Sequence, residues 1–181
     1  MTSVPSIDSI IESFPNPELP KIEGKPTHDD MANLRTLLAA NAASIPSLRG
    51  GGGHGYLGIV LSPAVYTTVS ATAWNNPNFP GAVPVIAPNA TAAATGEAVR
   101  QHTERLREWK EYTHVEAALK KQLINAIEPI YLRAIRDGHV GFDQHKVSDI
   151  LQHLMSSCGN ITAMDLETNS KTMKEPWQPF D

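Results

Sequence analysis

The amino-acid sequence predicts an all-α fold, a multi-helix bundle of six or seven helices with an extended N-terminal arm and a proline-rich loop. Three observations support this fold class. Apolar residues recur every three or four positions in most segments after residue 27, as they do on the buried face of a helix. Ser, Thr or Pro stands at the expected helix starts, and Gly or Pro follows the expected ends. The connections are short, as in helical bundles, and we expect under about a tenth of residues in strands.

The first 26 residues are rich in proline, with Pro at positions 5, 15, 17, 20 and 26. Each proline lacks a backbone N–H and biases the preceding residue away from helix. We therefore expect an extended arm over residues 1–26. A small apolar cluster in this arm has helical spacing, so a short amphipathic docking segment is the alternative to a bare linker. The cluster consists of Ile7, Ile10, Ile11 and Phe14.

The first firm helix is predicted from Thr27 to Ile45. Thr27 and Asp30 have the spacing of a capping box, in which each side chain accepts a hydrogen bond from the other residue's backbone N–H. Pro46 ends this helix. Its apolar residues at helical intervals are Met31, Leu34, Leu37, Leu38 and Ile45.

A glycine-rich tract follows from Gly50 to Gly55, and we expect a flexible connector there. Tyr56 to Leu61 form a short apolar run that we expect to be extended. The pair Ser62–Pro63 is typical of a helix start, with serine as the N-cap and proline at the first helical position. The sequence therefore predicts a second helix over residues 63–74. Four prolines between residues 77 and 88 then predict a loop.

Alanine and charged residues become frequent after residue 90 and favour a long helix over residues 91–112. Thr113 and Glu116 repeat the capping-box spacing. This spacing predicts that a separate helix begins at Thr113.

Pro129 permits only the first turn of a following helix, which Gly138 closes. Two more helices are expected over residues 147–158 and 162–175. The faces of successive helices must meet where the loops between them are short, so we expect eight residues to be buried together. They are Leu119, Leu123, Ile127, Tyr131, Leu132, Ile150, Leu151 and Leu154.

Composition excludes several classes of protein. Hydrophobic residues make up 41% of the chain and charged residues 19%, which is enough apolar material for a core and unlike a disordered chain. The net charge of −4 argues against a surface that neutralises nucleic-acid phosphates. A single cysteine, Cys158, excludes an intrachain disulfide framework and, without a signal-peptide pattern, predicts a cytoplasmic location. No run approaches the roughly 20 apolar residues that cross a bilayer, so no membrane partner is expected.

No motif in the chain has the spacing of a catalytic or metal site. HEXXH, CxxC and GxSxG patterns are absent, and His145 and His153 lie two helical turns apart, about 12 Å at 1.5 Å per residue. Cys158 has no basic neighbour in sequence that would activate its thiol. We therefore predict no catalytic, cofactor-binding or metal-ligating residue, and no enzyme activity.

The tract from Arg49 to Gly55 has one alternative interpretation. Consecutive glycines expose backbone N–H groups that suit an anion such as phosphate. The tract lacks the Lys-Ser/Thr ending of a P-loop and the GxGxxG turn of dinucleotide-binding proteins. The connector is therefore favoured over the phosphate site.

Four stretches carry a resemblance to a known family. They are GGGGHGYLGIVLSPAVY at 50–66, VEAALKKQLINAIEPIYLRAIRDGHVGF at 115–142, ILQHLMSSCGNITAMDLETN at 150–169 and MKEPW at 173–177. In this serial order they resemble the Gag polyprotein of copia-type long-terminal-repeat retrotransposons, over roughly residues 27–177. In that family the matching region resembles the N-terminal lobe of the capsid, which precedes a second helical lobe and an RNA-binding tail.

The resemblance implies a structural capsid lobe that self-associates into the shell of a virus-like particle and needs no cofactor. Its partner is then a second copy of itself in a ring or lattice, and RNA binds only through regions absent from this chain. Residues 27–174 form the capsid-like domain and residues 175–181 a linker or tail. An excised lobe and a truncated, domesticated copy are both compatible with a chain that ends at Asp181.

The expected contacts lie on the helix from Thr27 to Ile45 and on the helix after Ser62, because both carry apolar residues that the bundle does not need in full. The predicted self-association residues are Leu34, Leu37, Leu38, Val65 and Val69. A monomeric adaptor that binds a partner peptide or helix in an apolar groove is the alternative function. An enzyme of unrecognised type is a third, more distant possibility.

Overall fold

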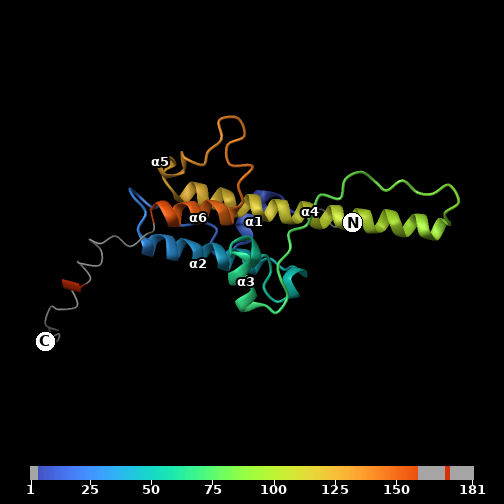
Figure 1. Ribbon diagram of the computed structural model, residues 1–181, viewed down its shortest axis with the longest axis horizontal. Helices are drawn as coiled ribbons and strands as arrows, with labels where there is room; N and C mark the ends of the chain where they lie inside the picture. Colours follow the sequence, from blue (N-terminus) through green and yellow to red (C-terminus); the bar gives the residue numbers. More distant parts are fainter. Residues whose placement is uncertain (1–3, 159–169, 172–181) are drawn as a thin grey trace.

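The computed structural model describes residues 4–158 and 170–171, and over these residues the elements are helical (Figure 1). Pairing of the β type is confined, within the described part, to two isolated bridges, Ile22–Ile127 and Asp137–Gly141. The predicted all-α, multi-helix fold is confirmed. The described α-helices are α1 (Ile7–Ser13), α2 (His28–Ser44), α3 (Pro63–Val69), α4 (Ala92–Ala126), α5 (Pro129–Leu132) and α6 (Val147–Ser157). Two 3-10 turns, η1 (Arg49–Gly51) and η2 (Leu57–Ile59), lie between α2 and α3.

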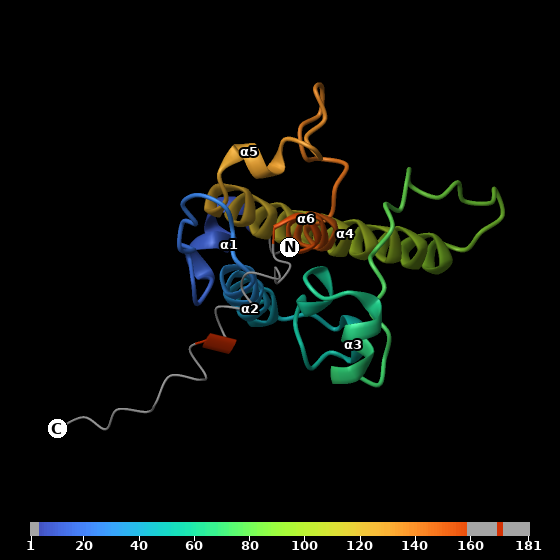
Figure 2. The same ribbon diagram turned by 60° about the vertical axis from the view of Figure 1, so that its left-hand side comes forward.

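The 35-residue helix α4 is the centre of the fold. Figures 1 and 2 show α1, α2 and α6 gathered around its C-terminal half, and all three contact it. Its N-terminal half extends away from this bundle, and the chain between α3 and α4 returns along it. The bundle therefore occupies only one end of its longest helix.

The sequence predicted two helices where the structure has the single helix α4. The hydroxyl of Thr113 donates a hydrogen bond to the carbonyl of Trp109, one turn back inside the helix, at 2.8 Å. A threonine bonded in this way caps no new helix. The predicted start at Thr113 is therefore wrong, because the capping-box spacing also occurs within a continuous helix.

Over the described residues 4–26, the chain does not form the predicted extended arm. The Ser6 hydroxyl accepts a hydrogen bond from the Ser9 backbone N–H and caps α1, which packs against α4. Ile10 and Phe14 of this segment are buried in the common core. The amphipathic docking segment, the alternative to a bare linker, is the interpretation that agrees with the structure. Burial of an apolar face against α4 stabilises a helix that would be too short to form alone.

Three buried or half-buried amides join this N-terminal segment to the bundle. The Asn41 amide nitrogen donates to the Asn16 carbonyl at 2.8 Å and to the Gln122 side-chain oxygen at 2.9 Å. The Gln122 amide donates to the carbonyls of Asn16, at 2.9 Å, and Pro17, at 2.7 Å. The Asn16 backbone N–H returns a bond to Asn41 Oδ1 at 2.9 Å. The cluster fixes the position of residue 16 against both α2 and α4.

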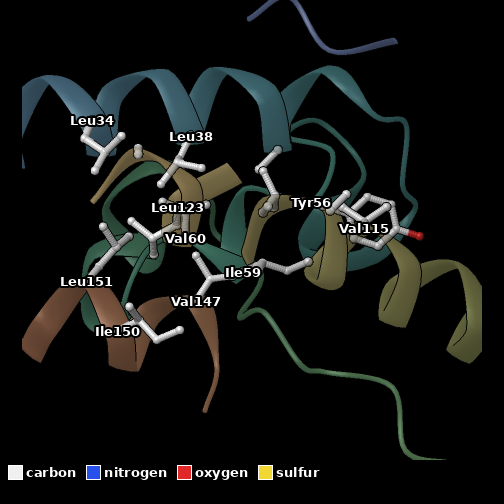
Figure 3. Packing of buried hydrophobic residues seen from close by; sticks show 14 of the residues in the cluster. Leu34, Leu38, Tyr56, Ile59, Val60, Val115, Leu123, Val147, Ile150 and Leu151 are labelled. Carbon is white, nitrogen blue, oxygen red and sulfur yellow. The ribbon is translucent and has the colours of Figure 1, made fainter. Parts of the chain in front are cut away.

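The predicted core is confirmed in most of its members (Figure 3). Seven of the eight residues are buried, namely Leu119, Leu123, Ile127, Leu132, Ile150, Leu151 and Leu154. Tyr131 is only half-buried. Leu34 and Leu38 of α2 are fully buried in the same cluster, so the prediction that they form a self-association surface is wrong. Their side chains face Leu123, Leu151 and the residues around them in Figure 3.

The predicted helix starts at Thr27 and Ser62 are confirmed. Thr27 and Asp30 form the reciprocal capping box, and hydrogen bonds from Thr27 lower the pKa of the Asp30 carboxyl. The Ser62 hydroxyl accepts from the Val65 backbone N–H at 3.4 Å. Residues 56–61 are not extended as predicted, because η2 folds them into a tight turn.

The C-terminal elements agree with the prediction in part. Helix α6 spans Val147–Ser157 as expected, but the helix predicted from Pro129 to Gly138 ends at Leu132. Turn residues at 133–135 follow it, and the Asp137 carboxylate then accepts hydrogen bonds from the backbone N–H groups of His139 and Val140 and forms a further turn. The helix predicted over residues 162–175 and the tail over 175–181 lie outside the described residues, apart from 170–171.

Leu123→Ala or Leu151→Ala should lower the free energy of unfolding by about 2–5 kcal/mol, because each leaves a cavity in the core. Urea denaturation measures this loss. Val85→Ala is the control: Val85 is 101% exposed and should change stability by less than about 0.5 kcal/mol. A loss below about 0.5 kcal/mol at both leucines would contradict the core assignment.

Stability should fall at alkaline pH because of two buried tyrosines. Burial, with the nearby Glu111 carboxylate, raises the pKa of Tyr56 to about 12, and burial also raises the pKa of Tyr112. The unfolded value is about 10, so the contribution of the neutral phenols is complete below pH 10 and is lost as pH rises from 10 toward 12. The urea midpoint against pH measures this loss. Tyr56→Phe should flatten the decline, and an unchanged slope would contradict the assignment.

Candidate interaction surfaces

Helix α3 is a short platform that presents two valines to solvent. Ser62 caps it and Pro63 occupies its first turn. Tyr66 points inward and is fully buried, whereas Val65 and Val69, one turn apart on the outer side, are 47% and 45% exposed. The predicted contact residues Val65 and Val69 are therefore accessible.

The platform is held by Tyr66 and the glycine-rich tract. The Tyr66 hydroxyl donates to the Gly50 carbonyl at 2.8 Å, and the Ser70 hydroxyl donates to the same oxygen at 2.7 Å. Gly50 has φ 58°, and a Cβ at this position would overlap the Tyr66 hydroxyl. The Trp74 ring lies 5.7 Å from the Tyr66 ring, centroid to centroid. Gly50 is thus a packed turn residue, and the prediction of a flexible connector is wrong at this position.

The charges around the glycine tract do not suit a phosphate group. Arg49 of the tract pairs with Glu108 at 2.9 Å. The cleft beside the tract is also lined by Glu104 and Glu111 of α4. Arg49 and Arg107 line it too, but each is already paired with a carboxylate, and three carboxylates against two arginines leave a net negative charge that disfavours an anion. The arrangement instead joins the tract to α4.

A groove lies next to α3, between α2, η2 and α6. It has a volume of about 560 Å³ and includes Val65 in its lining. Val60, Leu151 and Met155 contribute apolar surface to it, and Arg35 lies at its border with α2. The exposed face of α3 therefore continues into a hollow that is lined in part by apolar side chains.

The remaining predicted contact residues lie in α2 and are less accessible. Leu37 is half-buried. Leu34 and Leu38 face the core because the single apolar face of α2 is used up by its contacts with α4 and α6. The accessible part of the predicted surface is accordingly Val65 and Val69.

The residues tested as metal or nucleophile candidates have ordinary structural positions. His153 Nε2 lies 3.3 Å from the Tyr131 carbonyl, and the Cys158 backbone N–H donates to the Leu154 carbonyl at the end of α6. In the described ranges, no three His, Cys, Asp or Glu side chains are grouped so as to hold a metal ion. The pKa of Glu97 is lowered to about 2 by its hydrogen bonds to Arg100 and Gln101, which is the effect of a surface ion pair.

A second group of exposed apolar residues was not singled out from the sequence. It lies on the N-terminal half of α4 and on the loop that returns along it, and consists of Phe79, Val83, Val85 and Val99. Phe79 packs on Trp109 with ring centroids 4.8 Å apart, which ties the loop to the helix. Heptad spacing of apolar and small residues from Ala92 onward is the sequence signal for the helical part of this surface, to which Val99 belongs.

Comparisons with known proteins identify no relative. No protein-family model matches the chain, and no curated protein or solved structure matches it. The resemblance to copia-type Gag therefore rests on the sequence stretches alone. Over residues 4–158 and 170–171, none of the helices combines the length and apolar character required to cross a bilayer.

Gly50→Ala should destabilise the protein more than Gly24→Ala, because both glycines have positive φ but only Gly50 abuts another side chain. The left-handed backbone costs alanine about 1–2 kcal/mol at either site. Overlap with Tyr66 should add about 1–3 kcal/mol at Gly50. Thermal denaturation of the two variants measures the difference, and equal losses would contradict the packed role of Gly50.

Proposed function

We propose that this chain is a Gag-like capsid lobe that self-associates into the shell of a retrotransposon virus-like particle in the cytoplasm. The observation that carries the proposal is the exposure of Val65 and Val69 on α3, together with the serial resemblance to copia-type Gag. The residues that anchor α3, Tyr66 and Gly50, are buried. A rigid helix with an outward apolar face is a suitable contact element for a shell.

The contact is small, and small contacts suit this role. Shell subunits associate through repeated interfaces that close by symmetry. Interfaces below roughly 1,200 Å² are weak one at a time, and multivalency makes the assembly stable. Association should therefore depend strongly on protein concentration.

The proposed shell needs no chemistry from this lobe. RNA, in this proposal, is bound by regions absent from the chain, which agrees with its net charge of −4. No cofactor or metal is required, so the proposed assembly should be indifferent to chelators.

A monomeric adaptor is the alternative function. The groove of about 560 Å³ beside α3 favours it, because a partner helix or peptide could place apolar side chains against Val60, Leu151 and Met155. An adaptor of this kind keeps a constant mass as its concentration rises. The mean mass of a shell subunit's assemblies instead increases with protein concentration.

Val65→Asp and Val69→Asp should each weaken self-association by at least about tenfold, which is about 1.4 kcal/mol, because each places a charge on the apolar contact. Sedimentation and light scattering from micromolar to millimolar concentration, with electron microscopy, measure this. Thr67→Asp is the matched control, because it adds the same charge to another face of α3.

Alanine at His145, His153 or Cys158, and a metal chelator, should leave the association unchanged. Circular dichroism must show that each valine variant keeps its helices. A wild-type protein that stays monomeric at millimolar concentration would contradict the proposal, and one that then binds a peptide at the groove would favour the adaptor.

A further inference from the structure

The N-terminal half of α4 has few contacts to hold it. The fully buried residues of α4 begin at Val115, and before Tyr112 only His102 is buried. Figures 1 and 2 show residues 92–108 extending past the bundle. A helical segment of this length is marginally stable in water without packing. The burial of its side chains therefore indicates which contacts stabilise this half of the helix.

One face of this half of α4 is covered by other residues of the same chain. Thr95, Ala98, His102 and Trp109 follow one another at helical spacing and are half-buried or buried. Phe79 of the returning loop packs on Trp109. This face is covered within the monomer.

A different face is accessible and has coiled-coil spacing. Its residues alternate at intervals of four and three, and we call it the heptad face: Ala92, Gly96, Val99, Thr103, Leu106 and Lys110. All are exposed except Leu106, which is half-buried. The last five line a groove of about 580 Å³, which Val4 of the N-terminal segment and the neighbouring Arg100, Glu104 and Arg107 of α4 also line. Alternating four-and-three spacing is the pattern with which two helices pack against one another.

The charges beside the heptad face alternate in sign. Glu97, Arg100, Glu104, Arg107 and Glu111 follow in order along one flank. Within one chain Arg100 pairs with Glu97 at 2.8 Å, and Arg107 pairs with both Glu104 and Glu111. The order of acidic and basic residues is the same when the flank is read in either direction. If a reversed copy is shifted by one charged position, each acidic residue therefore lies opposite a basic residue.

We propose that the heptad face packs against the heptad face of a second copy in antiparallel orientation, with the two-fold axis near Gln101. This rests on the proposed self-association and names a contact surface separate from α3. Residue sizes fit the reversed arrangement. Gly96 lies opposite the partner's Leu106, Ala92 opposite the partner's Lys110 and Val99 opposite the partner's Thr103. Small residues at the tip of one helix receive large residues from the base of the other.

Charge selects the same orientation. In the antiparallel pair Glu97 comes within side-chain reach of the partner's Arg107, and Arg100 within reach of the partner's Glu104. In a parallel pair this charged flank faces the partner's opposite flank, the one that carries Thr95, His102 and Trp109, and Gly96 faces the partner's Gly96. That alternative leaves the alternating charges without a matching series across the contact and the glycine positions unfilled. The antiparallel pair is isologous and closes as a dimer, with the two bundles at opposite ends.

Disulfide trapping distinguishes the two orientations. In a Cys158→Ser background, a mixture of Gly96→Cys and Leu106→Cys chains should form a disulfide-linked heterodimer on mild oxidation. Leu106→Cys alone should not, because the two sulfurs of an antiparallel pair are roughly 15 Å apart along the axis at 1.5 Å per residue. Cross-linking of Leu106→Cys alone, or no link in the mixture, would overturn the proposal.

A substitution that keeps the monomer intact provides the second test. A Cβ at Gly96 meets no atom within 4 Å, so Gly96→Leu fits the monomer and favours helix. It should weaken the dimer at least tenfold by sedimentation, since the partner's Leu106 needs that space. Ala94→Leu, on an exposed face two residues away, should leave the dimer unchanged. Dimerisation of Gly96→Leu at the wild-type concentration would overturn the proposal.

The variants on α3 separate this inference from the proposed function. Val65→Asp should leave the α4 dimer intact while it removes larger assemblies. If the larger assemblies persist in Gly96→Leu and no dimer ever forms, the α4 contact is absent and the α3 contact stands. If dimers form but neither valine variant changes any assembly, the α4 contact stands and the α3 contact is absent.

Discussion

The apolar face of α4 between Tyr112 and Ala126 is the constraint on which the rest of the fold depends, because α1, α2 and α6 all pack against it. One polar residue, Gln122, interrupts that face. Its amide is satisfied by Asn41 and by the carbonyls of Asn16 and Pro17. A buried amide left without partners destabilises the fold by about 1–3 kcal/mol. The stable positions of α1 and α2 are therefore those in which the Gln122 amide keeps its hydrogen bonds. The cluster thus gives a specific geometry to a surface that otherwise offers only apolar contacts without directional preference.

Sequence motifs predict a helix start well where the hydrogen bonds that form the cap lie within the motif itself. Thr27 with Asp30, and Ser62 with Pro63, mark real helix starts because an N-cap is made by residues three positions apart. The same spacing misleads at Thr113, where the hydroxyl bonds backward to Trp109. Asn16, which follows the docked helix α1, bonds to Asn41 and Gln122, 25 and 106 residues away. No short window of sequence contains such partners, so proline content alone suggested an extended arm.

The candidate surface is harder to predict than the core for a related reason. Periodicity shows that a helix has an apolar face, but it does not show whether the same chain covers that face. Leu34 and Val65 look alike in sequence, and the structure buries the first completely and leaves the second 47% exposed. The heptad face of α4 escaped notice because glycine, threonine and lysine occupy half of it. All six residues lie within the predicted helix 91–112, but the structure is needed to show that this half of α4 extends beyond the bundle and leaves the face uncovered.

The long separation between the N-terminal segment and its docking site has a consequence for synthesis. Ile10 and Phe14 leave the ribosome before their docking face, because Gln122 and its neighbours follow about a hundred residues later. At about 5–20 residues per second, the segment stays undocked for roughly 5–20 s. During this interval Leu34 and Leu38 of α2, which are fully buried in the folded core, lack the α4 face that covers them. The nascent chain therefore exposes its apolar faces to whatever is nearby, including chaperones and other nascent copies translated from the same message.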